Sequence, residues 1–436
     1  MDDAAAYWNY KTAFGAKLIT PNLDRICAQS TAFRAAYCQA PICGPSRASF
    51  MSAKMPHQSG IFQNADALSW MSDPAALKDS WQYRLKSAGY FCSSGGKVHH
   101  GYKPLEKPVH NVLYSDRPKN FGNDMSLPPG VEKRKFGGHR SGWSTIDEKD
   151  DVTYHDYKSS ESAIAFFNDY DSEVPFYREI GLYSPHGPNI TPVRFKEMYR
   201  PGDFNPPADW AGGYTPNAYA EANFPTNANP AKIVWWRRSV RNYFSAFSHG
   251  DYHIGRVWDA LKASKHADNT IVIIIADHGF QLGNLNRYKK TTPWEQVAGV
   301  PFIVHDPASP TPREVFDPIA LIDVGPTILD YAEVPPLTHC FGKSVRPLVE
   351  GGSDPSRVVP TLTENVISIR AGHFRLIRYG DGSFQLFDLR TDYWQLHDLG
   401  PSQPEFPALY AALVESARES GMDLTKTGAE SVIALE

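Results

Sequence analysis

The sequence has few cysteines, no long apolar run and no excess of either charge. Five cysteines in 436 residues are too few for a disulfide scaffold, and their odd number leaves at least one thiol unpaired within the chain. The longest apolar run, residues 271–276, is far shorter than the ~20 residues that a membrane-spanning helix needs. Lysine and arginine number 44 against 48 aspartates and glutamates, which argues against a general nucleic-acid binder, because such a protein carries a basic face.

What is present is the composition of an ordinary globular protein. Apolar residues make up 42% of the chain and charged residues 21%. Proline, at 35 residues, exceeds its usual share of ~5%, which favours long ordered loops over a helical bundle. A chain of this length buries well over half of its unfolded surface, so it needs no covalent cross-links to be stable.

Strand and helix patterns alternate along the first three quarters of the chain. Residues 21–33 read as the first turns of a helix, and residues 235–263 as the longest helix. The continuous β-branched run at 270–276 is typical of a strand buried on both faces at the centre of a parallel sheet, and a similar run follows at 299–305. The alternation predicts an α/β fold with a large, mostly parallel or mixed sheet and helices on both faces.

The pattern changes after residue 354. Short alternating runs are separated by turn signals, among them Asp381-Gly382, a pair typical of hairpins. A helical segment follows near residues 408–419. We therefore predict a large domain over residues 1–354 and a smaller C-terminal α+β subdomain, with an antiparallel sheet, over residues 355–436.

Residues 201–230 form a second region of unusual composition. They are rich in proline, asparagine, glycine and alanine, and are too polar and too broken for a core element. Loops of this length are often functional, although a tolerated surface insertion is the alternative. Because loops at strand ends tend to carry specificity, we expect this loop and the C-terminal subdomain to border the functional site.

Residues 41–47, Pro-Ile-Cys-Gly-Pro-Ser-Arg, form the most specific segment of the chain. Cys43 precedes a proline-initiated helix, and Arg47 follows four residues later. A thiolate at this position would be stabilised by the helix N-terminus and by the guanidinium group. For an arbitrary cysteine the alternative is a small buried thiol.

Two acidic pairs are candidates for binding a cation. Asp277 ends the isoleucine-rich run and is followed by His278, and ligands in open α/β sheets gather at the carboxyl ends of strands. The alternative interpretation of Asp277 is a structural carboxylate in a capped turn. Asp2 and Asp3 form the second pair, which taken alone would usually belong to a solvated tail. A carboxylate-rich, all-oxygen site suits Ca²⁺ or Mg²⁺.

The segment around Cys43 resembles the sulfatase signature C-x-P-S-R. Other segments match this family in the same order along the chain: Thr20-Pro21-Asn22-Leu23-Asp24-Arg25, Lys97-Val98-His99-His100, Ser184-Pro185-His186, Asp277-His278-Gly279 and Gln385-Leu386-Phe387-Asp388-Leu389. The similarity spans nearly the whole chain and looks closest to the iduronate-2-sulfatase branch of the formylglycine-dependent, type I sulfatases. It implies the alkaline-phosphatase-like α/β fold, with residues 1–354 as the catalytic domain.

The resemblance implies a sulfuric ester hydrolase acting on a small or oligomeric sulfated carbohydrate. In this family the cysteine is oxidised to formylglycine, which implies a formylglycine-generating enzyme as a partner in maturation. One hydroxyl of the aldehyde hydrate attacks sulfur and expels the alcohol, and deprotonation of the other releases sulfate and re-forms the aldehyde. A cation, Ca²⁺ with Mg²⁺ as the alternative, polarises the sulfate. The implied cation ligands are Asp2, Asp3, the modified Cys43, Asp277 and His278.

The resemblance also assigns roles to basic residues. Lys97 becomes the electrostatic contact to the sulfate, and His100, rather than His99, becomes the base on the formylglycine hydrate. The alternative for a lone histidine is a structural role.

Three further positions match the family in the same way. His186 is the candidate acid for the leaving oxygen, and Arg47 orients the formylglycine. Lys290, thirteen residues after Asp277, matches the sulfate-binding lysine, whereas a solvated Lys289–Lys290 pair is the alternative.

The chain departs from the family pattern at four places. Only Met1 precedes the Asp-Asp pair, where the family has an apolar strand, and Ser52-Ala53 replaces Thr-Gly after the signature. Asn284-Leu285 replaces an acidic-His pair, and residues 393–395 replace Pro-x-Glu. The last two departures bear on the substrate more than on the core chemistry.

Two other functions fit parts of the pattern. One is a phosphonate or phosphate ester hydrolase of the same superfamily, which would use the same metal and formylglycine. The other is a catalytically silent protein that binds sulfated glycans, which requires Cys43 to stay unmodified.

The family is commonly periplasmic, lysosomal or secreted, whereas the N-terminus shows no basic-then-apolar signal segment, which is compatible with the cytoplasm.

Overall fold

The computed structural model describes residues 1–101, 103–122, 129–139, 143–229 and 231–425. Pro230, the last residue of the predicted loop, and residues 426–436 of the predicted C-terminal subdomain lie outside the described residues.

The main sheet is mixed, with the strand order β6-β7-β1-β8 and β9 paired to β1. Its strands are β1 (Thr31–Tyr37), β6 (Val272–Ile275), β7 (Gly299–His305), β8 (Arg313–Val315) and β9 (Ile319–Ala320). Strand β7 runs antiparallel to both β1 and β6, while β8 and β9 run parallel to β1. Strand β7 is fully buried, in agreement with the run at 299–305.

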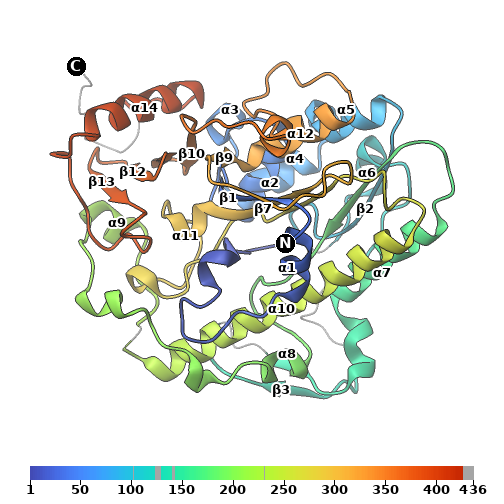
Figure 1. Cartoon of the computed structure of the whole chain (residues 1–436), viewed down its shortest axis with the longest axis horizontal. Helices are drawn as coiled ribbons and strands as arrows, with labels where there is room; N and C mark the ends of the chain where they lie inside the picture. Colours follow the sequence, from blue (N-terminus) through green and yellow to red (C-terminus); the bar gives the residue numbers. More distant parts are fainter. Residues whose placement is uncertain (102, 123–128, 140–142, 230, 426–436) are drawn as a thin grey trace.

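A parallel pair of strands, β2 (Phe91–Gly96) and β5 (Phe176–Gly181), lies beside the main sheet. Helices α2 (Cys43–Ser52), α4 (Asn64–Met71) and α12 (Val324–Tyr331) lie on one side of the strands, and α1 (Pro21–Cys27), α7 (His155–Asp169) and α10 (Ile233–Ala263) on the other (Figure 1). The predicted α/β fold with helices on both faces is therefore confirmed.

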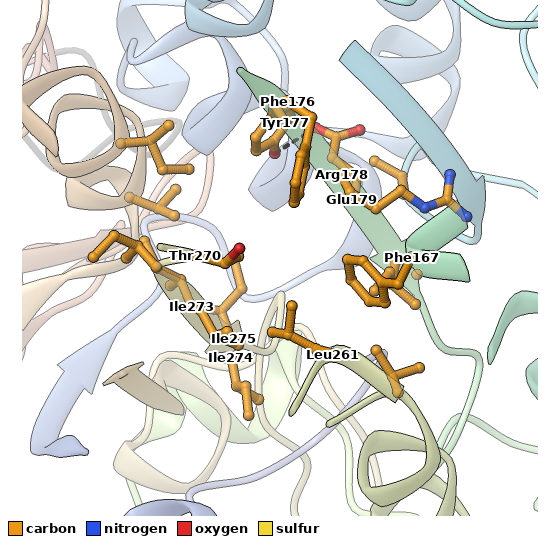
Figure 2. A pocket seen from close by; sticks show the side chains of 18 of the residues that line it. Phe167, Phe176, Tyr177, Arg178, Glu179, Leu261, Thr270, Ile273, Ile274 and Ile275 are labelled. Carbon is orange, nitrogen blue, oxygen red and sulfur yellow. Dashed lines mark hydrogen bonds between the residues drawn. The ribbon is translucent and has the colours of Figure 1, made fainter. Parts of the chain in front are cut away.

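Two sequence-based expectations need correction. The helix expected over residues 21–33 ends at Cys27, and the chain then enters β1 at Thr31. The isoleucine-rich run is not the centre of a parallel sheet, because among the described strands β6 pairs only with β7, in the antiparallel sense, and its residues are half-buried. The other edge of β6 faces a cavity instead of a neighbouring strand (Figure 2).

The C-terminal part forms the predicted antiparallel meander. Its strands, in spatial order, are β10 (Val358–Leu362), β11 (Ile367–Ala371), β12 (Phe374–Arg378) and β13 (Phe384–Asp388), and α14 (Phe406–Glu419) packs against them. At the predicted hairpin Gly382 has φ = +85°, a conformation that glycine adopts without steric cost.

The remaining helices and strands are short. They are α3 (Pro56–Ser59), α5 (Trp81–Ser87), α6 (Lys107–Leu113), α8 (Val193–Glu197), α9 (Ala218–Asn223), α11 (Glu295–Ala298), α13 (Arg346–Val349), β3 (Lys133–Lys135) and β4 (Trp143–Thr145). Among the described residues, no helix combines the length and apolarity that crossing a membrane requires.

The described part of loop 201–230 is held by specific contacts. The ring of Trp210 packs against Phe14, Trp236 and Trp394. The backbone N–H of Thr215 donates to the carbonyl of Leu396, which ties the loop to the C-terminal part of the chain.

A buried ion pair joins the main sheet region to the C-terminal meander, and we expect its loss to destabilise the protein. The guanidinium of Arg357 donates to both oxygens of Asp323, at 2.6 and 2.7 Å. We expect Arg357→Ala to lower the free energy of unfolding by about 3 kcal/mol, because it leaves a buried carboxylate without its counter-charge.

A urea titration measures this loss, and the exposed pair between Arg418 and Glu415 provides the control. Arg418→Ala is expected to cost less than about 1 kcal/mol, because exposed ion pairs contribute little. Equal losses in the two variants would contradict the role of the buried pair.

Candidate active site

The site lies where β6 ends, close to the start of α2 and the first residues of the chain. The amino group of Met1 donates to the carbonyl of Ile275, and the N–H of Asp277 donates to the carbonyl of Met1. These bonds set Asp2 and Asp3 beside Asp277. Residues 274 positions apart in the sequence thus meet at the carboxyl end of a strand, where ligands of open α/β sheets are usually bound.

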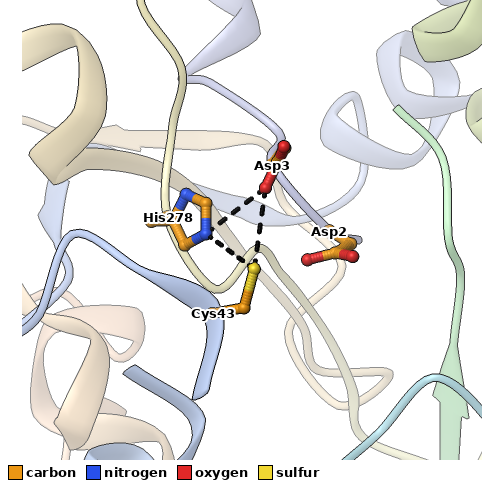
Figure 3. A group of neighbouring side chains, drawn as sticks. All are labelled: Asp2, Asp3, Cys43 and His278. Carbon is orange, nitrogen blue, oxygen red and sulfur yellow. Dashed lines mark hydrogen bonds and ion pairs between the residues drawn. The ribbon is translucent and has the colours of Figure 1, made fainter. Parts of the chain in front are cut away.

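Four side chains converge there (Figure 3). One ligand atom from each of Asp2, Asp3, Cys43 and His278 lies within 4.8 Å of the others, and all four residues are buried. The Nε2 atom of His278 lies 3.2 Å from Sγ of Cys43 and 3.3 Å from Oδ1 of Asp3. Within the described ranges, this is the one group of three or more such residues with metal-binding spacing.

Asp277 stands next to this group and is turned toward other partners. Its Oδ2 accepts a hydrogen bond of 3.1 Å from Nε of Arg47, and its Oδ1 accepts the backbone N–H groups of Asp3 and His278. Its Oδ2 still lies 3.8 Å from Nε2 of His278. Of the five predicted cation ligands, four therefore form one compact group and the fifth borders it.

The chemistry of this group fits a bound cation. Oδ2 of Asp3 is buried and has no hydrogen-bond partner among the described residues. A buried carboxylate oxygen without a partner is costly unless a cation or a donor occupies the space beside it. With two aspartates in the group and a third beside it, the site offers several carboxylate oxygens to a cation, together with Cys43 and His278.

Basic side chains surround the acidic group. The ammonium group of Lys97 contacts Asp2, and Arg47 lies 3.4 Å from the same carboxylate. Lys290 donates to Oδ1 of Asp3 at 2.7 Å and to Sγ of Cys43 at 2.8 Å. Although burial favours the protonated acid, Lys97 and the other nearby cations hold the pKa of Asp2 well below its usual range.

Cys43 and His278 have shifted pKa values that favour a charged pair. Burial and Asp2 oppose ionisation of the thiol, but His278 and Lys290 outweigh them and lower the pKa of Cys43. Burial disfavours the imidazolium of His278, but Asp277 and Cys43 outweigh it and raise the pKa of His278 to about 9. As the first residue of α2, Cys43 also lies at the positive end of the helix dipole. The site is therefore built to hold negative charge at position 43.

Two glycines in the motifs are explained by close packing. A Cβ on Gly44 would lie 2.8 Å from both the Cβ of Ala67 and the Oδ1 of Asn64. A Cβ on Gly279 would lie 2.3 Å from the carbonyl oxygen of Gln296. Both contacts are far shorter than packed atoms allow, so only glycine lets the chain approach at these two points.

The structure separates the two adjacent histidines. The ring of His99 is buried and lies 2.9 Å from the hydroxyl of Tyr114, which itself donates to Glu179. His100 is half-buried; burial, followed by the charges of Lys97 and Arg47, lowers its pKa to about 4. His99 thus belongs to a buried polar network, whereas His100 feels the positive charges of Lys97 and Arg47.

His186 is oriented by its own loop. Its Nδ1 lies 2.8 Å from the hydroxyl of Tyr183 and 2.5 Å from the carbonyl of Gly187. This leaves Nε2 directed toward the carboxylates of Asp3 and Asp2, at 3.9 and 4.0 Å. The adjacent Lys289 and Lys290 also differ, because among the described residues it is Lys290 that donates to Asp3 and Cys43.

Sequence reasoning missed one residue that supports the site. The carboxylate of Asp156 accepts the backbone N–H groups of Tyr183 and Ser184, and so holds the loop that carries His186. Asp156 lies in α7, thirty positions before His186, and belongs to none of the motifs. No local pattern marks it, because its role depends on the packing of α7 against β5.

Comparison with known proteins places these motifs in one family. The family model described as "Sulfatase" matches residues 1–334. A curated sulfatase from Formosa agariphila is 26% identical over 86% of this chain and 76% of its own length. Iduronate 2-sulfatase from Mus musculus is 24% identical over 75% of this chain and 67% of its own length.

Solved structures show the same fold. A protein bound to its substrate D-glucosamine-2-N,6-O-disulfate has a TM-score of 0.72 and 19% identity, and covers 96% of each chain. The phosphonate monoester hydrolase of Agrobacterium radiobacter has a TM-score of 0.74 and 17% identity, over 98% of this chain and 95% of the other. The family match extends over three quarters of the chain and contains every residue of the site, and the chain therefore belongs to the sulfatase family of sulfuric ester hydrolases.

Proposed function

We propose that this sulfatase releases sulfate from a sulfated carbohydrate, using formylglycine formed from Cys43 and a bound divalent cation. The observation that carries the proposal is the meeting of Cys43, at the start of α2, with Asp2, Asp3, His278 and Lys290. A formylglycine-generating enzyme would carry out the modification.

Formylglycine and the cation would each supply defined chemistry. As a hydrate, formylglycine supplies one hydroxyl that bonds to sulfur while the alcohol leaves, and a second whose deprotonation releases sulfate and restores the aldehyde. Asp2, Asp3, Asp277, His278 and position 43 would hold the cation, which would supply positive charge to polarise the sulfate; the carboxylates favour Ca²⁺, with Mg²⁺ as the alternative.

The basic residues of this chain take the remaining roles. Lys290 and Lys97 bind the sulfate oxygens through their positive charge, which reduces the repulsion between the anionic ester and the acidic site. Arg47, anchored to Asp277, keeps the side chain of residue 43 oriented. His186 donates a proton to the leaving oxygen, and His100 removes the proton that allows sulfate to leave.

We expect the pH dependence of the reaction to report on His100. Because its pKa is lowered to about 4, the imidazole is neutral at physiological pH and can accept a proton. The acid limb of the kcat profile is therefore expected near pH 4, with activity lost as the pH falls through this value, rather than near the ~6.5 of an unperturbed histidine.

Initial rates of sulfate release across the acid range measure this limb, with thermal unfolding at each pH to exclude loss of the fold. In parallel, His100→Ala is expected to lower kcat by about 10²- to 10⁴-fold. A limb near pH 6.5, or full activity in His100→Ala, would show that another group is the base.

The substrate class rests on the comparison with the glucosamine disulfate complex, whose protein shares this fold. We propose that residues 1–354 form the catalytic domain and that loop 201–230 and the C-terminal subdomain, 355–436, shape the sugar pocket. The contacts of Trp210 and Thr215 with residues Trp394 and Leu396 support this proposal, because they join the two segments.

One experiment separates this function from its nearest rival. The shared fold with a phosphonate monoester hydrolase favours phosphonate esters as the second candidate substrate. We expect the protein with added Ca²⁺ to release sulfate from sulfated glucosamine faster than it cleaves an aryl phosphonate monoester, and to lose activity on chelation of the cation. Faster phosphonate cleavage would reverse the assignment.

The mass of the tryptic peptide that carries Cys43 tests the third alternative, a silent glycan-binding protein. Formylglycine is lighter than cysteine, because an oxygen replaces the sulfur and two hydrogens are lost. We expect the lighter mass in protein from its native host, and an unmodified thiol together with an inactive protein would favour the binding function.

A further inference from the structure

Basic side chains gather where strand β3 lies near helix α10. Strand β3 consists of Lys133, Arg134 and Lys135, all exposed. It pairs with β4, which packs against α8, and α8 packs against α10 (Figure 1). On α10, Arg238 and Arg241 are three residues apart and so lie on one face of the helix. We call these five residues the basic cluster.

The segment after β3 is fixed to α10 by close backbone contacts. The N–H of His139 donates to Oγ of Ser239 at 2.7 Å, and the side-chain amide of Asn242 donates to the carbonyl of Gly137 at 2.7 Å. Gly138 has φ = +94°, and a Cβ on it would lie 2.9 Å from the backbone nitrogen of Ser239. These contacts hold the two halves of the basic cluster together.

The two arginines of α10 have no acidic partner among the described residues. The guanidinium of Arg241 donates to the carbonyl of Phe136 and lies 4.7 Å from the centre of its ring. Burial, followed by the charges of Arg238 and Arg134, lowers the pKa of Arg241 to about 10. Arg134 has an exposed counter-charge, Glu197, at 3.9 Å. Positive charges held together with so little compensation favour the binding of an anion.

A hollow of about 440 Å³ adjoins the basic cluster at the start of α10. Its lining includes Gly138, Lys232, Val234, Trp235 and Arg238. The side chain of Val234 is 58% exposed, which is unusual for an apolar residue of this size. The hollow thus combines two cations with an indole ring and an exposed apolar group. Cations pair with sulfate oxygens, and apolar groups pack against the C–H face of a sugar ring.

The hollow lies close to the active site. The ring of Trp235 contacts the rings of His139 and Tyr288, at 5.8 and 5.9 Å between centroids. Tyr288 precedes Lys290 by two residues, which span at most ~7 Å of chain. A carbohydrate with one unit at Lys290 can therefore reach the hollow with a neighbouring unit. This position favours an occupant that is continuous with the substrate.

We propose that the hollow and the basic cluster form a second carbohydrate-binding site, which takes a sulfate group on another unit of the same sugar chain. Arg238, which belongs to both the hollow and the cluster, pairs with this sulfate, and Trp235 packs against the sugar ring. For its substrate class the inference rests on the proposed function. It makes the substrate an oligosaccharide that carries more than one sulfate.

Equilibrium binding to the Cys43→Ala variant tests the proposal, because this variant is expected to bind substrate without turning it over. The probes are a sulfated tetrasaccharide from heparin and sulfated glucosamine, both titrated by calorimetry. We expect the tetrasaccharide to bind about tenfold more tightly than sulfated glucosamine. Adding Arg238→Ala is expected to lower the affinity for the tetrasaccharide about tenfold, and to affect sulfated glucosamine less, because one charge-assisted contact is lost.

Lys262→Ala is the matched control, added to Cys43→Ala in the same way. It removes another exposed cation of α10, about 36 Å away along the helix axis, and we expect it to change the affinity for the tetrasaccharide by about twofold or less. Since the readout is binding, it does not depend on sulfate release. A protein without sulfatase activity would still report on the second site, and loss of the second site would leave the proposed function intact.

Amide hydrogen exchange locates the bound sugar. We expect the tetrasaccharide, but not sulfated glucosamine, to slow exchange in residues 231–238. Unchanged exchange there, or equal affinities of the Arg238→Ala and Lys262→Ala variants for the tetrasaccharide, would overturn the proposal. Equally tight binding of the desulfated tetrasaccharide, or of an oligothymidylate of eight nucleotides, would also overturn it, because the site would then not be specific for a sulfated sugar.

Discussion

Replacement of Cys43 by alanine is expected to abolish sulfate release while the protein stays folded. The variant removes the atom that lies beside Lys290 and His278, and with it the precursor of the nucleophile. Loss of a nucleophile lowers turnover by on the order of 10⁴-fold or more. The side chain is small, so circular dichroism and the unfolding midpoint are expected to change little.

Two further variants make the test specific. Cys340→Ala removes a cysteine whose thiol donates to the carbonyl of Gly342, and we expect it to retain full activity. Cys43→Ser keeps one hydroxyl but lacks the second that expels sulfate, so we expect a sulfated peptide at position 43 to accumulate in mass spectra. Undiminished turnover in Cys43→Ala would refute the mechanism.

The adjacent lysines provide the second large effect. Lys290 contacts both Asp3 and Cys43, whereas burial and the charge of Arg287 lower the pKa of the adjacent Lys289. We expect Lys290→Ala to lower kcat/KM by about 10²- to 10³-fold, because a positioned charge at the reacting group is removed. Lys289→Ala is expected to change it by about twofold.

Steady-state kinetics of the two purified variants, with thermal unfolding of each, measure this difference. A loss of binding alone would raise KM and leave kcat unchanged, whereas we expect kcat to fall for Lys290→Ala. Similar losses in the two variants would mean that the lysines act as a general basic surface, which is the simpler interpretation of a Lys-Lys pair.

The sequence predicts the fold best where a pattern is long or bounded by turn residues. Helix α10, strand β7 and the C-terminal meander all appear close to their predicted ranges. The sequence does not predict strand β1, because Pro21 and the apolar residues after it are typical of a helix start. No strong stop signal before Thr31 shows that this helix ends at Cys27. The prediction that the run at 270–276 is the centre of a parallel sheet was wrong for a different reason. Its apolar residues line a cavity, and composition alone does not distinguish a cavity from a neighbouring strand.

The sequence by itself determines the family and the identity of the chemical groups. The motifs around Cys43 and Asp277 contain the residue types that sulfate ester hydrolysis requires. Only the tertiary structure decides how these groups are used. It turns Asp277 toward Arg47, and it pairs His99 with the hydroxyl of Tyr114, whereas the neighbouring His100 feels the charges of Lys97 and Arg47 instead. Neighbours in sequence diverge in this way because each side chain follows its local backbone direction, and residues as distant as Asp3 and Asp277 meet only when the chain packs.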